Sequence, residues 1–399
     1  MKDSVVKTVP LGDVVDVIGG GTPSKRNPAF YGGEIPWATI RDMNVEHLKN
    51  TEHSITPAGL KGSSAKIIPA GEIVVATRVG LGKVCILGQA TAINQDLRGL
   101  VPKSDVDIDR RFLFHWYASI ADKVIEAGTG ATVQGVKLPF VKSLPFPALS
   151  LQEQQRIVAV LDEAFEGLAR ARAHAEANLQ NARELSSAAV EAVFNRLPAS
   201  TLIEELRNLC TERGITYGVI KLGDHDPKGV PCLRTSNVRP LRIDVDGMKV
   251  IAPNLSNEYS RTILQGGEVL VNVRGTLGGV ATVPDHMAGW NISREVAMLP
   301  VDHSRLDPDF ASFFLSTRGA QAWLTGVVKG AAYKGINLTD LRLLRIPVPG
   351  LDVQAEIARE IVELRLKTQA VEDFCAAKLE DLDDLRRSLL QKAFAGELA

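Results

Sequence analysis

The strongest constraint on this sequence is that it repeats itself once, at a spacing close to half of its 399 residues. Residues 70–82, AGEIVVATRVGLG, match residues 266–278, GGEVLVNVRGTLG, at an offset of 196 positions. Residues 130–138 match residues 330–338 at an offset of 200 positions. A nearly constant offset with small slips in loops is the mark of duplication, so the chain is predicted to contain one structural unit twice.

The first part of each repeat has the character of a mixed α+β domain. Short β-branched runs such as 72–77 and 268–273 are bounded by Gly and Pro, which is typical of strands joined by turns. Residues 110–122 and 308–317 occupy equivalent positions and are predicted to form amphipathic helices. The sequence therefore predicts two globular α+β domains, at residues 1–150 and 198–350.

The second part of each repeat changes to a heptad pattern, which predicts a central helix at 151–197 and a distal helix at 351–399. At about 1.5 Å per residue, each helix would be about 70 Å long. Such apolar seams need a partner, and the simplest partner is the other copy. We therefore expect an antiparallel coiled coil and an approximate twofold relation between the two domains. The expected seam residues are Leu161, Phe165, Leu168, Ala175, Leu179, Ala182, Ala189 and Val193, interrupted by Arg172 and Ser186, and in the second helix Ile357, Ile361, Leu364, Val371, Cys375, Leu382, Leu385 and Leu389.

Composition excludes several classes of protein. Hydrophobic residues make up 45 % and charged residues 23 % of the chain, as in an ordinary globular protein. No apolar run reaches the roughly 18 residues of a membrane span, and the first residues have no apolar signal region, so a cytoplasmic location is predicted. The four cysteines form no CxxC pair and the seven histidines form no HExxH pattern, so no metal site is predicted.

The net charge of −1 does not by itself predict a polyanionic partner. The two predicted helices are acidic, with net charges of −2 for 151–197 and −4 for 352–398. The remaining residues, mainly the globular domains, therefore carry +5. This modest excess allows a basic face on the domains but is weak evidence for nucleic-acid binding.

Residues 11–24 read LGDVVDVIGGGTPS and are followed by YGGEIPWATIRD at 31–42. Together these segments resemble the opening of a target-recognition domain in the specificity subunits of type I restriction–modification systems. The region at 218–237 resembles a second, different opening. Residues 144–157 and 344–357 resemble the family's central and distal spacers, so the likeness covers essentially the whole chain in the expected order.

The resemblance implies a non-catalytic protein in which each domain reads one half of a bipartite, asymmetric DNA target. The coiled coil would fix the spacer between the halves and dock methyltransferase subunits, usually two, with restriction subunits completing the complex. S-adenosylmethionine, ATP and Mg²⁺ would belong to those partners, with no cofactor in this chain. Residues 27–31 have no clear counterpart near 224–228, which favours two different half-sites.

Candidate DNA-contacting residues follow from side-chain chemistry, since Arg grips phosphates or guanine edges and Asn pairs with adenine. Further candidates are Thr132, Gln134, Tyr333 and Lys334, because they lie in Gly-bounded loops at matching repeat positions. Arg78 and Arg274 are equivalent in the repeat, so internal ion pairs are an alternative role for them. The candidates are Arg41, Asn44, Arg78, Thr132, Gln134, Arg234, Asn237, Arg239, Arg274, Tyr333 and Lys334, with Val190, Phe194, Leu390 and Phe394 as candidate methyltransferase-docking residues.

Two other classes of function compete with DNA recognition. An enzyme, a fused methyltransferase or nuclease, is disfavoured because 19–21 lacks a GxGxxG fingerprint and 27–30 lacks the second Pro of a methyltransferase motif. S-adenosylmethionine binding by the isolated chain would favour it. A coiled-coil scaffold with two protein-binding heads also fits the modest charge, and DNA affinity insensitive to salt would favour it.

Overall fold

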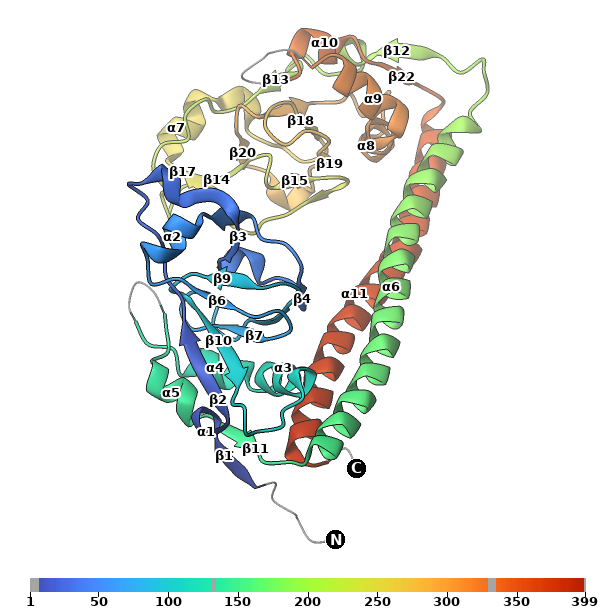
Figure 1. The fold of residues 1–399 in the computed structure, drawn as a ribbon. Coiled ribbons are helices and arrows are strands. Elements are labelled where there is room, and N and C mark those ends of the chain that lie inside the picture. The colour runs from blue at the N-terminus through green and yellow to red at the C-terminus, as the bar shows by residue number, and fades with distance from the viewer. Residues whose placement is uncertain (1–6, 131–133, 329–334, 398–399) are drawn as a thin grey trace. The chain divides into compact units, whose positions relative to one another are not determined.

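The computed structural model describes residues 7–130, 134–328 and 335–397, and the chain divides into two compact units. Unit 1 comprises residues 1–176 and 377–399, and unit 2 comprises residues 177–376. Each unit thus takes one α+β domain with about half of each long helix, a division that differs from the four consecutive segments expected from the sequence. The order of the elements along the chain can be followed in Figure 1.

The domain of unit 1 is built on two larger sheets. The first has the strand order β2-β10-β7-β8-β4 and the second has the order β5-β3-β9-β6, while β1 pairs with β11. The strands are β1 Thr8–Pro10, β2 Val15–Gly19, β3 Tyr31–Ala38, β4 His47–Leu48, β5 His53–Ile55, β6 Lys66–Ile68, β7 Ile73–Ala76, β8 Val84–Leu87, β9 Thr91–Ile93, β10 Leu97–Pro102 and β11 Pro145–Pro147. The helices are α1 Leu11–Val14, α2 Pro57–Lys61, α3 Arg110–Ser119, α4 Ala121–Glu126 and α5 Leu138–Ser143, with 3-10 turns η1 Pro28–Phe30 and η2 Ile40–Asp42.

The domain of unit 2 repeats this plan with smaller sheets, ordered β13-β21-β18-β19 and β17-β14-β20, and with the pairs β12-β22 and β15-β16. The strands are β12 Ile203–Glu205, β13 Thr216–Tyr217, β14 Val230–Leu233, β15 Val238–Arg239, β16 Arg242–Ile243, β17 Lys249–Ile251, β18 Val269–Asn272, β19 Val280–Thr282, β20 Asn291–Ile292, β21 Val296–Leu299 and β22 Arg345–Pro347. The helices are α7 Pro253–Glu258, α8 Pro308–Ser316, α9 Arg318–Gly326 and α10 Leu338–Arg342, with 3-10 turns η3 Leu206–Leu209, η4 Ser260–Thr262 and η5 Asp285–Met287.

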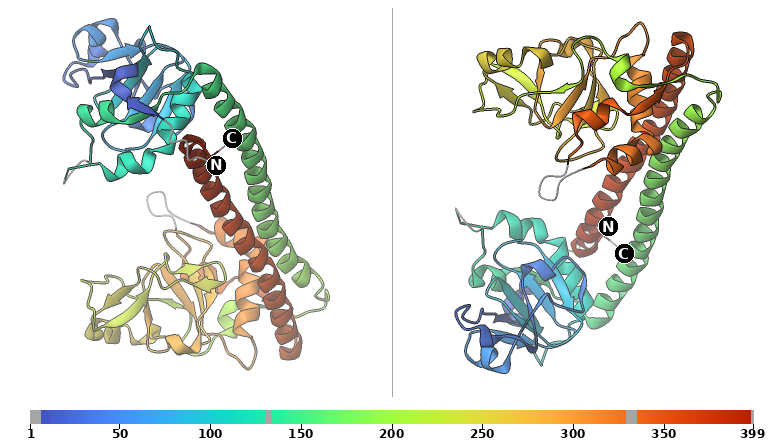
Figure 2. Two further views of the ribbon diagram at one scale, coloured as in Figure 1. Left: turned by 90° about the horizontal axis from the view of Figure 1, so that it is seen from below. Right: turned by 90° about the horizontal axis from the view of Figure 1, so that it is seen from above.

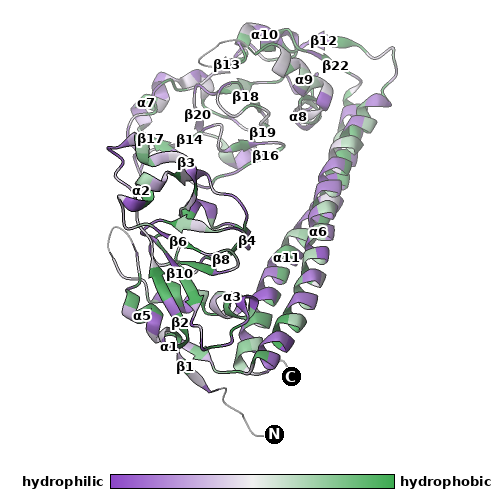
Figure 3. Cartoon of the chain, viewed as in Figure 1, coloured by the Kyte–Doolittle hydropathy of each residue, from purple (hydrophilic) through white to green (hydrophobic). Residues whose placement is uncertain are grey.

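The expected mixed α+β class and its repetition are confirmed. β7 and β18, predicted from the two β-branched runs, are equivalent strands whose residues are all buried. β7 pairs antiparallel with β10, and β18 pairs antiparallel with β21. α3 and α8 occupy the two predicted amphipathic segments. In Figure 3 hydrophobic residues lie along β2 and β10, while hydrophobic and hydrophilic residues alternate along the long helices.

The two long helices, α6 Leu151–Asn195 and α11 Leu351–Ala395, are 45 residues each, or about 68 Å. In each unit the segment of α6 lies beside the segment of α11 with the opposite chain direction (Figures 1 and 2). The seam predicted for α6 includes Leu161 and Ala175, which are buried. The coiled-coil architecture is therefore present within both units.

The predicted seam of α11 is wrong at two positions, because Val371 and Leu385 are 46 % and 47 % exposed. At both turns the residue one position further along the helix contacts α6. Glu372 forms an ion pair of 3.1 Å with Arg183 of α6, and the guanidinium of Arg386 lies 4.2 Å from the centre of the Phe165 ring. Long charged side chains with partners on α6 thus replace apolar residues there, and the apolar heptad alone could not show this.

The four residues proposed for partner docking instead anchor the helices to the domains. Val190 and Phe194 are 5 % and 8 % exposed, and the Phe194 ring lies 5.2 Å from that of Phe310 on α8. Leu390 is 6 % exposed in the core of unit 1, and Phe394 is half-buried with its ring 5.1 Å from that of Phe112. Docking through Val190, Phe194 or Leu390 is therefore contradicted, because the domain covers the helix face that looked free in a two-helix seam.

Candidate functional site

In unit 1 the connection between β9 and β10 is a short turn, Asn94–Asp96, which we call turn A. Backbone hydrogen bonds fix it to distant segments: Gly21 N donates to Ile93 O at 2.9 Å, and Asn94 N donates to Ala38 O at 3.0 Å. The carbonyl of Asp96 accepts from two consecutive N–H groups, those of residues 77 and 78, at 2.9 and 3.2 Å. Turn A is therefore held from three directions by buried backbone.

In unit 2 the connection between β20 and β21, Ser293–Glu295, has the same construction, and we call it turn B. Val219 N donates to Ile292 O at 2.8 Å, and Ser293 N donates to Leu233 O at 2.8 Å. The carbonyl of Glu295 accepts from the N–H groups of residues 273 and 274 at 2.9 and 3.2 Å. Each bond has its counterpart in turn A, at repeat offsets of 195 to 199 positions, so the two turns are equivalent by structure.

Two glycines permit this close approach of backbone to the turns. Gly20 follows β2 and Gly218 follows β13, and a Cβ at either position would overlap a carbonyl oxygen, that of Asn94 or of Ile292. The Gly19–Gly21 run thus serves as a strand-to-loop turn with tight packing. Its role is to hold turn A in place.

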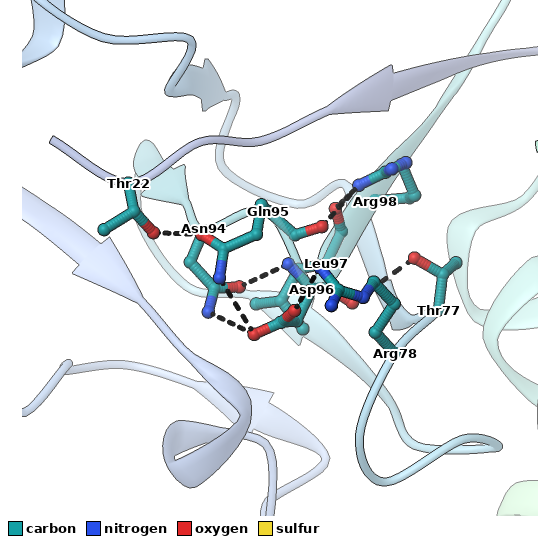
Figure 4. Close-up of polar contacts among 8 residues, drawn as sticks. All are labelled: Thr22, Thr77, Arg78, Asn94, Gln95, Asp96, Leu97 and Arg98. Carbon is teal, nitrogen blue, oxygen red and sulfur yellow. Dashed lines mark hydrogen bonds and ion pairs between the residues drawn. The ribbon is translucent and has the colours of Figure 1, made fainter. Parts of the chain in front are cut away.

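The side chains around turn A form a polar cluster, drawn in Figure 4. A guanidinium nitrogen of Arg78 lies 3.5 Å from the Asp96 carboxylate, and Asn94 donates to the same carboxylate at 3.1 Å. Arg98 donates to the carbonyls of Gln95 and Leu97 at 2.9 and 2.7 Å. Burial, with the neighbouring positive charge of Arg78, lowers the pKa of Arg98 from its ordinary value. Two adjacent guanidinium groups make this a place where an anion or an electron-rich base edge is favoured.

Around turn B the arrangement is more open. Arg294 is exposed, and among the described residues its guanidinium has no hydrogen bond or ion pair. Arg274, equivalent to Arg78, lies 5.8 Å from the centre of the Tyr217 ring. Tyr217, Val273, Arg274 and residues 336–340 line a cavity of about 360 Å³ beside it. A cationic side chain that lies beside both an aromatic ring and a cavity is suited to contact a planar or anionic group.

Some of the residues selected from the sequence do meet at these turns. An isolated β-bridge joins Arg78, just after β7, to Gly135. It places Val79 beside Gln134, whose carbonyl accepts from Val79 N at 3.3 Å. Arg274 forms the equivalent bridge with Gly335. Arg78 is half-exposed, so it both pairs with Asp96 and faces solvent. Thr132, Tyr333 and Lys334, which were also selected, lie outside the described residues.

Arg41 and Asn44 lie near one another, on and just after η2. The Arg41 side chain is 73 % exposed and 3.8 Å from the Glu52 carboxylate. Asn44 donates to the carbonyl of Arg41 at 3.3 Å and accepts from Lys83 at 2.7 Å. Arg41 and Lys83 therefore present positive charge around an amide that is itself already hydrogen-bonded.

The prediction that Asn237 reads DNA is wrong. Its side chain is 0 % exposed, and its amide accepts from Arg234 N at 3.0 Å and donates to Asp244 O at 2.9 Å. Asn237 therefore stabilises the loop that leads into β15. Arg234 is half-buried and donates to Gly247 O at 2.8 Å, whereas Arg239 is exposed on the β15-β16 hairpin. Of these three residues, Arg239 keeps the accessibility that a DNA contact needs.

Three residues at the turns were not predicted from the sequence: Gln95, Arg98 and Arg294. The signal was present, since INQDL at 93–97 aligns with ISREV at 292–296 at an offset of 199. The two segments share only their first residue, and a repeat search based on identity passes over them. Their equivalence rests on backbone hydrogen bonds.

Among residues 7–130, 134–328 and 335–397, no group of three or more His, Cys, Asp or Glu side chains is placed to hold a metal ion. The four thiols are free, and burial raises the pKa of Cys85, Cys210 and Cys232 to about 12. No helix in the same part of the chain is long and apolar enough to cross a membrane.

The chain thus contains two domains of one construction, each with a hydrogen-bonded turn that exposes polar side chains. Residues 4–174 and 225–370 match the family described as type I restriction modification DNA specificity domain. The chain belongs to this family, whose members are specificity subunits and not the catalytic subunits.

The relatives of the chain bear out this membership along its whole length. The chain is 23 % identical to the type I restriction enzyme EcoBI specificity subunit of Escherichia coli, over 98 % of this chain and 80 % of that protein. It is 24 % identical to the EcoKI specificity subunit of Escherichia coli strain K12, over 98 % and 88 %. Over 41 % of each chain it is 31 % identical to the EcoR124I/EcoR124II specificity subunit.

Solved structures show the same fold. A chain from a study of complex assembly and conformational transition of the type I R-M system superposes with a TM-score of 0.73, at 20 % identity and 99 % coverage of both chains. The HsdS subunit from Thermoanaerobacter tengcongensis gives a TM-score of 0.52 at 19 % identity, covering 99 % of this chain and 98 % of that one.

Proposed function

We propose that this chain is the DNA-reading subunit of a type I restriction–modification complex, in which each unit reads one half of a bipartite, asymmetric target. The observation that carries the proposal is the pair of equivalent turns. Their backbones are fixed by the same hydrogen bonds, but their exposed residues differ, Gln95 in turn A and Arg294 in turn B. One scaffold with two different contact residues favours two different half-sites over a palindrome.

Charge supports a DNA contact at the turns even though the whole chain is nearly neutral. Turn A has Arg78 and Arg98 around one Asp96 carboxylate, and Arg41 adds an exposed guanidinium elsewhere in the same unit. Arg side chains are among the groups that contact phosphates and so position a protein on the duplex. DNA binding that rests on these contacts should weaken steeply as salt concentration rises.

The long helices would fix the separation of the half-sites and dock the methyltransferase subunits, two per chain. Three large apolar side chains on these helices support docking, since Leu185, Leu366 and Phe374 are 64 %, 67 % and 68 % exposed. These side chains leave apolar surface available for contact with a partner subunit. These three replace the buried residues that the sequence suggested.

The remaining partners would be restriction subunits, and the complex would act in the cytoplasm. S-adenosylmethionine, ATP and Mg²⁺ would be bound by the partner subunits and not by this chain. A specificity subunit of this kind contributes recognition, and the methyl transfer and cleavage steps take place on the other subunits.

The test is methylome sequencing of a methylation-free host that expresses this chain with its neighbouring methyltransferase, compared with the methyltransferase alone. We expect an asymmetric split motif, methylated on adenine in both halves, only when both proteins are present. A stable complex of the two proteins that methylates no motif would overturn the proposal and favour a scaffold role. A palindromic motif would refute the assignment of different half-sites to the two units.

A further inference from the structure

The equivalence of turns A and B separates residues that the two units share from residues in which they differ. Arg78 and Arg274 are the same residue at the same place in both units, so they cannot distinguish two half-sites. Gln95 and Arg294 occupy the exposed position of each turn and differ in chemistry. We propose that Gln95 contacts an adenine and Arg294 contacts a guanine in the two half-sites, whereas Arg78 and Arg274 contact phosphates. This inference rests on the proposed DNA-reading function.

Both residues sit on rigid backbone, as a group that discriminates between bases must. The residues before each of them, Asn94 and Ser293, are 6 % and 2 % exposed. The residues after them have carbonyls that accept two N–H groups at 2.9 and 3.2 Å in both units. Gln95 and Arg294 are thus exposed side chains, each between a buried residue and a residue whose carbonyl is doubly hydrogen-bonded. An exposed turn with this much support is a place to present one side chain accurately.

The free hydrogen-bonding capacity of Gln95 fits adenine. Its Oε1 accepts from the Thr22 hydroxyl, and its Nε2 donates to the Asp96 carboxylate at 3.3 Å. A side-chain amide has two acceptor lone pairs and two donors, so one acceptor and one donor remain. Adenine presents a donor at N6 and an acceptor at N7 in the major groove, which this remaining pair matches. The Thr22 and Asp96 bonds also fix the plane of the amide.

The guanidinium of Arg294 fits guanine. It has no partner among the described residues, and Arg294 N donates to Val219 O at 2.9 Å, which fixes the base of the side chain. Guanine presents two acceptors, N7 and O6, to which a guanidinium donates two parallel bonds. Arg78, in contrast, is engaged by Asp96 at 3.5 Å, which suits a positioning contact to a phosphate better than a base contact.

The experiment uses the complex of the full chain with its methyltransferase in a methylation-free host, with the methylome as readout. The variants are Gln95→Ala, Arg294→Ala and Arg294→Gln. The matched controls are Gln89→Ala, an exposed glutamine between β8 and β9, and Arg345→Ala, an exposed arginine on β22. Thermal melting and gel filtration of each purified complex establish that it is folded and assembled.

We expect Arg294→Ala to lose discrimination at one guanine of one half-site, by about 5- to 150-fold, while the other half-site is unchanged. Gln95→Ala should relax one adenine in the other half-site only, and Arg294→Gln should shift the preference at its position from guanine towards adenine. Both controls should leave the motif unchanged.

The outcomes separate this inference from the proposed function. No split motif with the wild-type chain would overturn the proposed function itself. A wild-type motif that stays unchanged in folded complexes of all three variants would overturn only the inference. Uniform loss of methylation in a folded complex, without relaxation at one base, would show a phosphate contact and also overturn it. If Arg294→Ala fails to fold, Arg294→Gln gives the decision at that position.

Discussion

Gln154 and Gln354 make the same three hydrogen bonds in the two units. Oε1 of each accepts from a backbone N–H, that of Asp109 at 2.9 Å or that of Asp307 at 2.8 Å. Nε2 of each donates to two backbone carbonyls at 2.8–3.3 Å. Asp109 and Asp307 are the N-caps of α3 and α8, so each glutamine joins the first turn of a long helix to the start of a domain helix.

Replacement of either glutamine by leucine should destabilise its unit. Gln154→Leu or Gln354→Leu leaves one N–H and two carbonyls without a partner in a buried site, which should lower the free energy of unfolding by about 2–4 kcal/mol. Urea unfolding of the isolated chain measures the change. Gln152→Leu, at an exposed position of the same helix turn, is the control and should change stability by less than about 0.5 kcal/mol. Equal effects at 152 and 154 would contradict the anchoring role.

Leu390 should contribute to the stability of the chain in the absence of any partner. Leu390→Ala removes a side chain from the core of unit 1 and should cost about 2–4 kcal/mol. Leu385→Ala, five positions earlier on the same helix and 47 % exposed, should cost less than about 0.5 kcal/mol. Unfolding of the isolated variants decides the point. If Leu390→Ala weakened only the complex with the methyltransferase, the docking role predicted from the sequence would be restored.

The glycines behind the two turns should not tolerate a side chain. Gly20→Ala and Gly218→Ala each place a Cβ against a carbonyl oxygen, so turn A or turn B must move. We expect a loss of stability of about 2 kcal/mol or more and loss of recognition of the corresponding half-site only. Gly167→Ala is the control, since nothing lies within 4 Å of its Cβ position on α6, and it should stabilise the chain by about 0.5–1 kcal/mol. Retention of both half-sites by the Gly20 and Gly218 variants would argue against the turns as the reading elements.

His115 should make unit 1 less stable under mildly acidic conditions. Its side chain is 1 % exposed, and burial lowers its pKa from the ordinary value, with Arg111 adding to the effect while Glu46 and Asp162 oppose it. Because the unfolded chain then binds the proton more readily, this contribution to stability is complete above the unfolded pKa of about 6.5 and declines as the pH falls below it.

The comparison of wild type with His115→Leu isolates this contribution. The urea midpoint should decrease more between about pH 7.5 and about pH 5.5 in the wild type than in the variant, since only the wild type has the histidine to protonate. Equal decreases in the two proteins would assign the acid sensitivity to other groups.

Several features of the fold followed from the sequence because their signals are local or periodic. The β-branched runs around Val74 and Leu270 are buried strands, as their composition predicted. The heptads predicted both long helices to within a few residues. The matching segments 144–157 and 344–357 contain Gln154 and Gln354, which prove to be structurally equivalent. Such signals survive because each depends on residues close together in the chain.

The candidate site was predicted less well, because it depends on contacts between distant segments. Asn237 has the right chemistry to read adenine, yet its amide stabilises a loop, and no local pattern distinguishes these uses. Arg78 was found because it lies in a well-matched repeat segment. Gln95 and Arg294 were missed because the turns diverge in sequence while their backbones do not.

The sequence by itself determined that the chain is one unit used twice, with an α+β domain and a long helix in each copy, because duplication and periodicity are written in residue order. The tertiary structure decided which side chains are free. In the folded chain Leu390 and Phe194 are buried against the domains, and Glu372 of α11 forms an ion pair with α6. Turn A and turn B have the same backbone hydrogen bonds. The physical reason is that exposure and register depend on what packs against a residue from elsewhere in the chain, and residue type alone does not specify that neighbour.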